Sequence, residues 1–244
     1  MLNIFKRYFY WNKKKKTVCY TYVSDGYDDL INHRYVCKNW EYICFTNNPK
    51  LLKRSRIGIW KIVPSKFEKL DSKRNSGWHK THPHILFPEY DVSVWVDANV
   101  NILTPYLSKY INIHNDNIII TPLHFRRDCI YDEVQEVRIV KYDSDQSLDN
   151  MLDLLNKARM PKHYGLNETN IMFRRHNTDV VKKIDSDWWN CIENYSARDQ
   201  CSFNYVLFKN NINISDISIP NARFDTKNFK MSKHNKHHSQ GIEK

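Results

Sequence analysis

The sequence is poor in glycine, and its glycines form no nucleotide-binding pattern. Among 244 residues there are five glycines, and no two of them are spaced as GxG or as the ends of GxxxxGK. The first pattern marks the dinucleotide-binding loop, and the second marks the phosphate loop of P-loop NTPases. Both classes of nucleotide site are therefore excluded.

Cysteine pairs and long apolar runs are also missing. The six cysteines include no CxxC pair and no Cys/His block with zinc spacing. Several lie in apolar runs, which predicts buried free thiols and a reducing compartment. No apolar run approaches the ~18–20 residues that span a bilayer. The N-terminus lacks the apolar stretch and cleavage site of a signal peptide. These absences predict a cytoplasmic protein.

The positive charge is concentrated at the two ends of the chain. The net charge is +11, of which residues 1–16 carry +6 and residues 227–244 carry +4, leaving about +1 for residues 17–226. A nucleic-acid-binding domain normally carries its basic surface on the folded body, so we expect no nucleic-acid partner. The aromatic and basic residues of 1–16 suit the surface of an anionic membrane, on its cytoplasmic face. The alternative is a first element packed on the body and followed by a solvated lysine run.

Strand-like and helix-like segments alternate along the body. Apolar runs that stop at Gly, Pro or Asn predict strands, and apolar residues at helical spacing predict helices between them. The expected strands are 17–23, 41–45, 59–63, 92–96 and 117–121, with further strands possible at 168–173 and 212–219. The expected helices are 74–87 (broken around Pro83), 104–112, 147–157, 178–192 and 199–208. This alternation predicts an open α/β sheet in a single domain.

The domain boundaries follow from composition. We expect a basic aromatic extension over residues 1–16, the folded domain over residues 17–226, and a basic, His-rich tail over residues 227–244. No internal repeat or linker divides the central part.

The most informative local pattern is the run from Val94 to Asn99, which reads VWVDAN. An apolar strand that ends in Asp97 brings its carboxylate to the carboxyl edge of the sheet, where open α/β folds bind ligands. If the strand continues, the oxygens of Asp97 and Asn99 point at one spot. Mn²⁺ or Mg²⁺ bridging a diphosphate would suit such ligands. The plain alternative is a strand that happens to end in an acid.

Short motifs follow one another in a fixed order along the body. They are Tyr20-Thr21, Gly26-Tyr27-Asp28, Tyr42 to Pro49, Trp60-Lys61-Ile62, Arg74, Trp78-His79-Lys80, Pro83-His84, Phe87 to Tyr90, Trp95 to Asn99, His124, Arg127 to Glu133, Gly165 to Asn170, Arg174 to Asn177, Trp188-Trp189 and Ser196 to Phe203. In this order they resemble the hexosyltransferase-like family of plant mucilage proteins, whose bacterial relatives are associated with surface-polysaccharide synthesis. The resemblance covers roughly residues 17–210.

The resemblance implies a GT-A-type fold, a Rossmann-like open mixed sheet flanked by helices. It implies transfer of a sugar from a nucleotide-sugar donor, expected to be UDP-linked, to a glycan or lipid-linked saccharide acceptor. Asp97-Ala98-Asn99 is then similar to the DxD motif that holds metal and diphosphate. The second acid is replaced by Asn99, which leaves metal dependence open. His237 and His238 would be further metal ligands.

Two carboxylates are candidates for catalysis. In the resemblance, Asp199 lies in the acceptor region and could deprotonate an acceptor hydroxyl, whereas its plain role is a helix N-cap. Glu168 is the second candidate, and its plain role is a solvent-side strand residue. The expected donor-binding residues are Tyr20, Thr21, Tyr22, Gly26, Asn47, Arg74, Lys80, Asp97, Ala98, Asn99, His124 and Arg127.

The sequence thus favours a glycosyltransferase over two alternatives. One is a basic-tailed module that binds nucleic acid or membrane without catalysis. The other is a different nucleotide-using enzyme on the same sheet, such as a nucleotidyltransferase.

Overall fold

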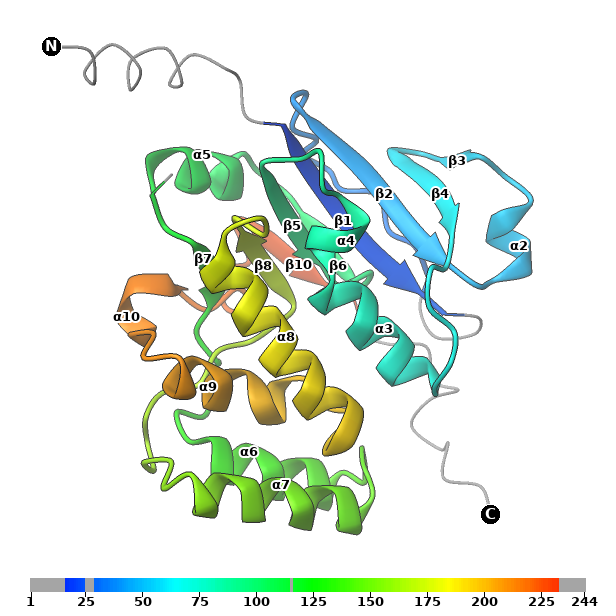
Figure 1. The fold of residues 1–244 in the computed structure, drawn as a ribbon. Coiled ribbons are helices and arrows are strands. Elements are labelled where there is room, and N and C mark those ends of the chain that lie inside the picture. The colour runs from blue at the N-terminus through cyan, green and yellow to red at the C-terminus, as the bar shows by residue number, and fades with distance from the viewer. Residues whose placement is uncertain (1–15, 25–28, 115, 233–244) are drawn as a thin grey trace, which may run out of the picture.

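A computed structural model describes residues 16–24, 29–114 and 116–232, and shows an α/β domain built on one large mixed sheet (Figure 1). The strand order in that sheet is β3-β4-β2-β1-β5-β8-β7-β9. Its strands are β1 (Thr17–Val23), β2 (Trp40–Thr46), β3 (Arg56–Ile57), β4 (Trp60–Pro64), β5 (Val92–Val96), β7 (Ile119–Pro122), β8 (Ile171–Arg174) and β9 (Ser218–Ile219).

The central strands β4, β2, β1 and β5 run parallel, whereas β8 runs antiparallel to both of its neighbours. Two short strands, β6 (Val100–Ile102) and β10 (Phe229–Met231), form a separate antiparallel pair. Parallel strands bring their carboxyl ends to one edge, so the ends of β1 and β5 lie side by side.

Six of the described helices form two groups. In Figure 1, α3, α4 and α8 lie in front of the sheet, and α6, α7 and α9 form a layer below. The helices are α2 (Pro49–Leu52), α3 (Ser72–Thr81), α4 (Pro83–Leu86), α5 (Tyr106–Ile113), α6 (Ile130–Ile139), α7 (Asp145–Lys157), α8 (Asp179–Asn194), α9 (Gln200–Lys209) and α10 (Ile214–Ile217). Helix α8 packs on both α3 and α9 and so joins the two groups.

The sheet is buried on both faces because side chains alternate along each strand. In β1, Val18 and Tyr20 belong to the core under α6–α9, and Cys19 and Val23 belong to the core on the opposite face, with α5 and the β6–β10 pair. A near-continuous apolar strand such as β1 is typical of this two-sided burial. All six cysteines are free and five are buried.

Most of the expected strands and helices are present, with several differences. The break at Pro83 separates α3 from α4. The segment 212–219 was expected as a strand, which is wrong for most of its length: it forms α10, because the side chain of Asn213 accepts a hydrogen bond from Ser215 N and begins a helical turn. Helix α6 was not expected, and neither were the short elements α2, β3, β6 and β10.

Strand β10 lies in the segment expected to be a tail. Its pairing with β6 extends the folded body to at least Ser232. The N-terminal extension lies outside the described residues except for Lys16.

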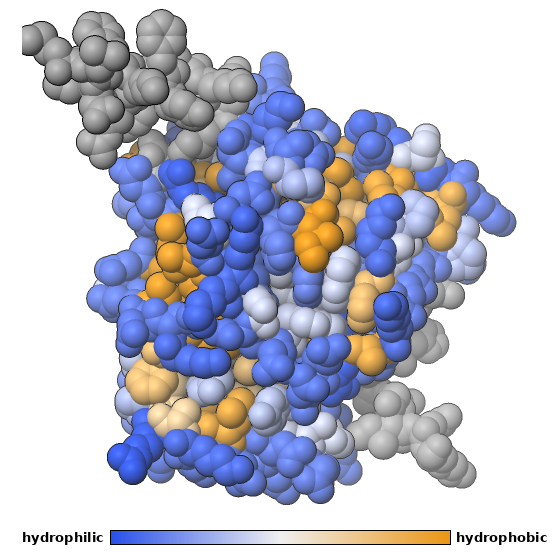
Figure 2. Space-filling view, viewed as in Figure 1, coloured by the Kyte–Doolittle hydropathy of each residue, from blue (hydrophilic) through white to orange (hydrophobic). Residues whose placement is uncertain are grey.

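The face seen in Figure 2 is mainly hydrophilic, with small separate apolar patches. One of them lies over α4, which carries the 57 % exposed Ile85. Within the described ranges, no helix combines the length and apolar character needed to cross a bilayer.

Candidate functional site

A cleft opens at the carboxyl edge of the sheet, where β1 and β5 end. It contains about 1080 Å³ of space not filled by atoms, part of it open to solvent. Its walls come from distant parts of the sequence: Tyr22, Ser24, Ser72, Lys73, Ser76, Gly77, Lys80, Trp95, Asp97, Ala98, Asn99, Glu168, Thr169, Asn170, Ala197, Arg198, Asp199, Gln200, Arg223 and Met231. A cleft of this size at this edge is where an open α/β sheet binds a ligand.

The ammonium group of Lys80 lies between two carboxylates. Its Nζ is 3.4 Å from Oδ1 of Asp97 and forms a short ion pair with Oδ2 of Asp199. It also lies 5.1 Å from the centre of the Trp95 ring, within cation–π range. Only 6 % of the Lys80 side chain is exposed. A buried cation is thus held between two partly exposed anions.

A fully buried network fixes the backbone at Lys80. Arg174 Nη2 donates hydrogen bonds of 2.6 Å to the Lys80 carbonyl and to the Tyr20 hydroxyl, which itself donates to the same carbonyl. The Arg174 guanidinium is paired at 2.7 Å with Asp185, and neither side chain is more than 1 % exposed. Carbonyls in the last turn of a helix lack helical partners, so Arg174 also stabilises the end of α3.

Asp97 is held by the end of β5. Its backbone N–H donates to the Asn170 carbonyl, and its Oδ1 accepts a 2.6 Å hydrogen bond from Trp95 Nε1. Strand β5 ends at Val96 and the chain turns at Ala98. The strand therefore does not continue through Asn99, which was the condition for the oxygens of Asp97 and Asn99 to point at one spot. Asp97 and Asn99 nevertheless line the same cleft.

Asn99 is tied to the end of the described chain. Its side-chain amide donates to the Ser232 carbonyl at 3.1 Å, and Ser232 N donates to the Asn99 carbonyl at 2.8 Å. The chain beyond Ser232 therefore starts beside the DxD-like motif.

Asp199 precedes α9 and caps it, since its side chain accepts a hydrogen bond from Gln200 N. Burial alone would raise the pKa of Asp199. The attraction of Lys80 and Arg198, with hydrogen bonds from Lys80 and Thr169, outweighs burial and holds the pKa below its ordinary 3.8. Asp199 is therefore ionised at neutral pH.

Glu168 has the opposite electrostatic environment. Its carboxylate accepts hydrogen bonds from Arg223 Nε at 2.6 Å and from Asn170 Nδ2 at 2.7 Å. Burial raises the pKa of Glu168 above its ordinary 4.5 even though both partners lower it, and the charge of Asp97 adds to the rise. Asn170 is itself buried, and its Oδ1 accepts no hydrogen bond within the described structure.

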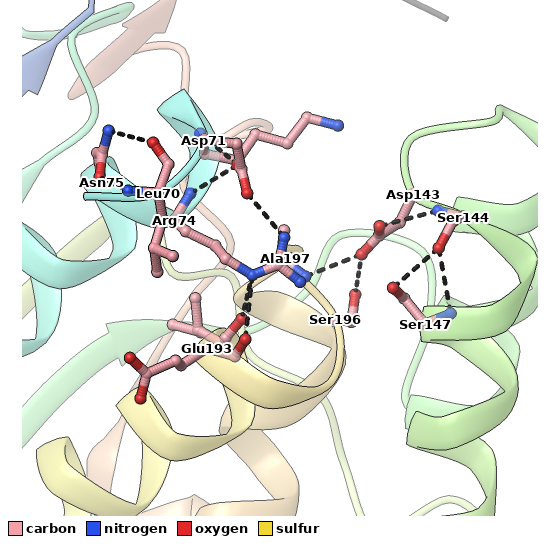
Figure 3. A network of polar contacts seen from close by, with 12 residues as sticks. Leu70, Asp71, Arg74, Asn75, Asp143, Ser144, Ser147, Glu193, Ser196 and Ala197 are labelled. Atoms are coloured by element: carbon pink, nitrogen blue, oxygen red, sulfur yellow. Dashed lines mark hydrogen bonds and ion pairs between the residues drawn. The ribbon is translucent and has the colours of Figure 1, made fainter. Parts of the chain in front are cut away.

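Arg74 points away from the cleft lining. Figure 3 shows its guanidinium between Asp71 and the loop that follows α8. It pairs with Asp71 at 2.7 Å and donates to the carbonyls of Ile192, Glu193 and Tyr195. These bonds fix the chain just before Asp199. Arg74 was expected to bind phosphate, and the structure instead uses it to join α3 to α8.

Close packing reinforces the same junction. A Cβ at Gly77 would lie 2.9 Å from Cγ2 of Ile192, which is closer than side chains normally approach. The small residue thus lets α3 and α8 lie in direct contact. The second part of the Figure 3 network fixes the same loop, because Asp143 accepts hydrogen bonds from Ser196 Oγ and Ala197 N.

The other expected donor-binding residues lie in several places. Tyr22, Lys80, Asp97, Ala98 and Asn99 line the cleft. Tyr20 and Thr21 are fully buried in the sheet, and Asn47 follows β2 without being among the described residues that line the cleft. Gly26, His237 and His238 lie outside the described residues.

His124 and Arg127 follow β7 and bond to one another and to α6. His124 Nδ1 accepts a hydrogen bond from Arg127 N, and Arg127 pairs with Glu133 at 2.7 Å. Burial, followed by nearby arginines, lowers the pKa of His124 to about 4, so its imidazole is neutral at pH 7. Both residues organise a loop and do not line the cleft.

The sequence analysis missed several cleft residues, among them Trp95, Thr169, Asn170, Arg198, Gln200 and Arg223. Thr169 and Asn170 directly follow Glu168, and Gln200 follows Asp199. Arg198 directly precedes Asp199, and Trp95 stands two residues before Asp97. Proximity to a candidate acid was thus a usable signal for five of the six. Arg223 is far from every candidate acid in the sequence, so the sequence offered no signal for it.

The donor atoms only partly satisfy the implied metal site. Asp97 contributes one carboxylate and Asn99 one amide. No group of three or more His, Cys, Asp or Glu among the described residues could hold a metal. Mg²⁺ is often held by one or two carboxylates with substrate phosphates and water. The residues present therefore fit a cation completed by a bound diphosphate.

Comparison with known proteins identifies the family of the chain. The sequence matches the family described as TOD1/MUCI70, glycosyltransferase-like domain, over residues 11–238. A probable hexosyltransferase, MUCI70 of Arabidopsis thaliana, is 25% identical over 212 residues, which are 77% of this chain and 36% of that protein. An alkaline ceramidase, TOD1 of the same plant, is 24% identical over 218 residues, covering 80% of this chain and 43% of that protein.

Among solved structures, the apo form of the bifunctional glycosyltransferase WbbM is similar to this fold. The TM-score is 0.51 at 11% identity, covering 85% of this chain and 39% of that one. This likeness confirms the GT-A-type α/β fold. The chain spans less than half the length of each of these three proteins, and the two plant relatives have different activity names.

Proposed function

Because this chain belongs to the TOD1/MUCI70 family of glycosyltransferase-like domains, we propose that its cleft transfers a sugar from a nucleotide-sugar donor to a saccharide acceptor. The observation that carries the proposal is the buried Lys80, held between Asp97 and Asp199 at the ligand-binding edge of the sheet. A sugar diphosphate needs positive charge where its leaving group departs, and Lys80 supplies it.

The donor diphosphate lies over the DxD-like motif. Asp97 and Asn99, with His237 or His238 as further ligands, would hold Mn²⁺ or Mg²⁺, which when bound neutralises diphosphate charge. Lys80 donates hydrogen bonds to the departing phosphate oxygen. The nucleoside, uridine in our proposal, extends toward Tyr22 and Ser24 at the end of β1.

The pKa directions suggest different roles for the two acids. Asp199 remains an anion and is a weak base, so it stabilises positive charge that develops on the sugar ring. Glu168 has a raised pKa and is the better proton acceptor. It takes the proton of the acceptor hydroxyl as that oxygen bonds to the anomeric carbon and the bond from that carbon to the phosphate oxygen breaks. The sequence analysis placed Asp199 first and Glu168 second as the catalytic base, and this assignment reverses that order.

The proposal also covers the kind of acceptor and the place in the cell where the protein acts. The acceptor is a growing glycan or lipid-linked saccharide of a surface polysaccharide such as lipopolysaccharide or capsule. The protein acts in the cytoplasm, at the inner face of an anionic membrane. The competing function is a basic-tailed module without catalysis.

A thermal-shift panel of UDP, GDP, CDP and ADP, each with and without Mn²⁺, tests the proposal. A bound diphosphate at a hundredfold excess over its Kd should raise Tm by about 5–10 °C, because binding stabilises the folded state. The Asp97→Asn variant should lose the Mn²⁺-dependent part of that rise and at least about 100-fold in sugar transfer.

The matched control is Asp153→Asn, which makes the same change at an exposed position on α7. It should behave as the wild type. Equal shifts and equal transfer in the Asp97 and Asp153 variants would refute the assignment. Salt-sensitive polyanion binding that persists in Asp97→Asn, without any diphosphate shift, would favour the non-catalytic module.

A further inference from the structure

Beyond the cleft, two loops carry a cluster of aromatic and basic side chains. It consists of Phe125, Arg126, Arg223 and Phe224, and we call it the aromatic platform. The guanidinium carbons of Arg126 and Arg223 lie 4.8 and 5.0 Å from the centre of the Phe125 ring. Phe224 meets Phe125 edge to face at 5.9 Å. Phe224 is 71 % exposed, an unusual position for a large apolar side chain.

Both loops are fixed by their own hydrogen bonds. The first follows β7 and the second follows β9, and the two strands pair in parallel. Asn221 joins them, since its side-chain nitrogen donates to the Leu123 carbonyl. Its side-chain oxygen accepts from the backbone N–H groups of Arg223 and Phe224. The backbone that carries the exposed ring is therefore fixed by these hydrogen bonds, and the ring itself packs against Phe125.

The platform is continuous with the cleft through Arg223. This residue lines the cleft, where its Nε bonds to Glu168, and its guanidinium also lies over Phe125. A ligand that covers Phe224 can thus reach the acid assigned as proton acceptor.

Position in the sheet separates the platform from the donor. Strands β1 and β2 lie on one side of β5, and β7 and β9 lie on the other. Tyr22 and Ser24, where the nucleoside is placed, follow β1. The platform follows β7 and β9 and so belongs to the opposite half of the site. A ligand on the platform would therefore lie on the side of the site opposite the proposed donor position.

The charges indicate what kind of saccharide that is. Arg127 is paired with Glu133 and Glu136, and Arg223 with Glu168. Arg126 is exposed and forms no ion pair with an acid in the described ranges. An open aromatic face suits the C–H face of a sugar ring, and an adjacent guanidinium without a carboxylate suits an anionic substituent.

We propose that the aromatic platform binds the acceptor and that this acceptor is an acidic saccharide, one that carries uronate groups. A sugar ring stacks on Phe224, a carboxylate pairs with Arg126, and the reacting hydroxyl faces Glu168. The inference rests on the proposed function only in calling the bound saccharide the acceptor. The binding site itself can be tested without any transfer reaction.

The test is a saturation-transfer NMR titration of the full chain with tri-galacturonate and with neutral galactotriose. Tri-galacturonate should bind more tightly than galactotriose. Phe224→Ala and Arg126→Ala should each weaken tri-galacturonate binding by about five- to tenfold, and Arg126→Ala should remove the preference for the acidic trimer. Ile139→Ala, at a 74 % exposed position on α6, is the control and should bind as the wild type does.

The diphosphate shift of each variant is measured in parallel. An unchanged diphosphate shift with lost tri-galacturonate binding supports the platform as a separate site. If the wild type takes up a diphosphate but not tri-galacturonate, or if Phe224→Ala binds the trimer unchanged, the platform inference is wrong and the proposed function stands. If the trimer binds at the platform and no diphosphate binds, the saccharide site stands and the proposed function fails.

Discussion

The two ends of the cleft carry the same kind of ion pair with opposite burial. At one end a buried cation, Lys80, contacts anions that are partly open to solvent, with 36 % of the Asp97 side chain and 21 % of the Asp199 side chain exposed. At the other end a buried anion, Glu168, meets an Arg223 side chain that is 43 % exposed. The pKa of Asp199 is lowered and that of Glu168 is raised.

This contrast shows that an ion pair does not fix the charge state of its acid. Coulombic attraction lowers the pKa of a carboxyl, whereas removal from water raises it, and the balance decides the direction. At both acids burial is the largest single cause and raises the pKa. At Asp199 the combined attraction and hydrogen bonds of Lys80, Arg198 and Thr169 outweigh burial. At Glu168 the attraction and hydrogen bonds of Arg223 and Asn170 do not. One cleft thus contains an acid that stays charged and an acid suited to accept a proton.

The largest expected effect is that of Lys80→Met. It leaves two anions facing each other without a cation, and should cost about 2–4 kcal/mol of unfolding free energy. Sugar transfer should fall by about 100- to 1000-fold. Urea unfolding and a transfer assay measure the two effects, with Lys157→Met on the exposed face of α7 as control. A fully active Lys80→Met protein would contradict the role given to this end of the cleft.

The pH dependence of stability separates the two acids directly. The stability that Asp199 contributes is lost as pH falls through its lowered pKa, so the advantage of wild type over Asp199→Asn should shrink on acidification. Glu168 has a raised pKa, so its contribution is present below its ordinary 4.5 and is lost as pH rises through the raised value.

The advantage of wild type over Glu168→Gln should therefore grow on acidification. Urea unfolding of the three proteins between about pH 2 and 7 gives both differences. If the two stability differences changed with pH in the same direction, the electrostatic environments of Asp199 and Glu168 would not be opposite.

The smallest effect is expected from Asn99→Asp. The substitution removes the amide that donates to the Ser232 carbonyl and should cost about 1 kcal/mol. It also restores a second acid to the DxD-like motif and should tighten Mn²⁺ binding, which electron paramagnetic resonance measures without any turnover. Asn156→Asp on α7 is the matched control. Unchanged Mn²⁺ affinity in Asn99→Asp would remove this motif as the metal site.

The fold could be predicted from the sequence wherever the pattern was local. Strands β1 and β5 have the expected bounds, because each is a continuous apolar run that ends in a turn signal. Strand β10 was missed, since three residues pair only with the distant β6. In α6 the spacing of Ile130, Val134 and Val137 is helical, but the many charges between them hid it.

The site was harder to predict because sequence spacing does not give direction. Arg74 and Lys80 were expected to reach the same phosphates. Residues six apart on a helix point about 120° away from each other, so only one of them can face the cleft. Lys80 does, and Arg74 bonds to the end of α8 and to the residue that follows the helix. The place of Asp97 at the edge of the sheet could be predicted because it depends on one strand alone, β5.

The contact between Gly77 and Ile192 has a consequence for how the protein can respond to its substrates. Helices α3 and α8 are locked by that contact and by the bonds of Arg74, so Lys80 and the loop that carries Asp199 belong to one rigid body. The groups that act on the donor are thereby pre-positioned before any substrate arrives. Within the part of the chain that the structure describes, the two cleft walls that carry Lys80 and Asp199 would therefore move together if the cleft closed around a substrate.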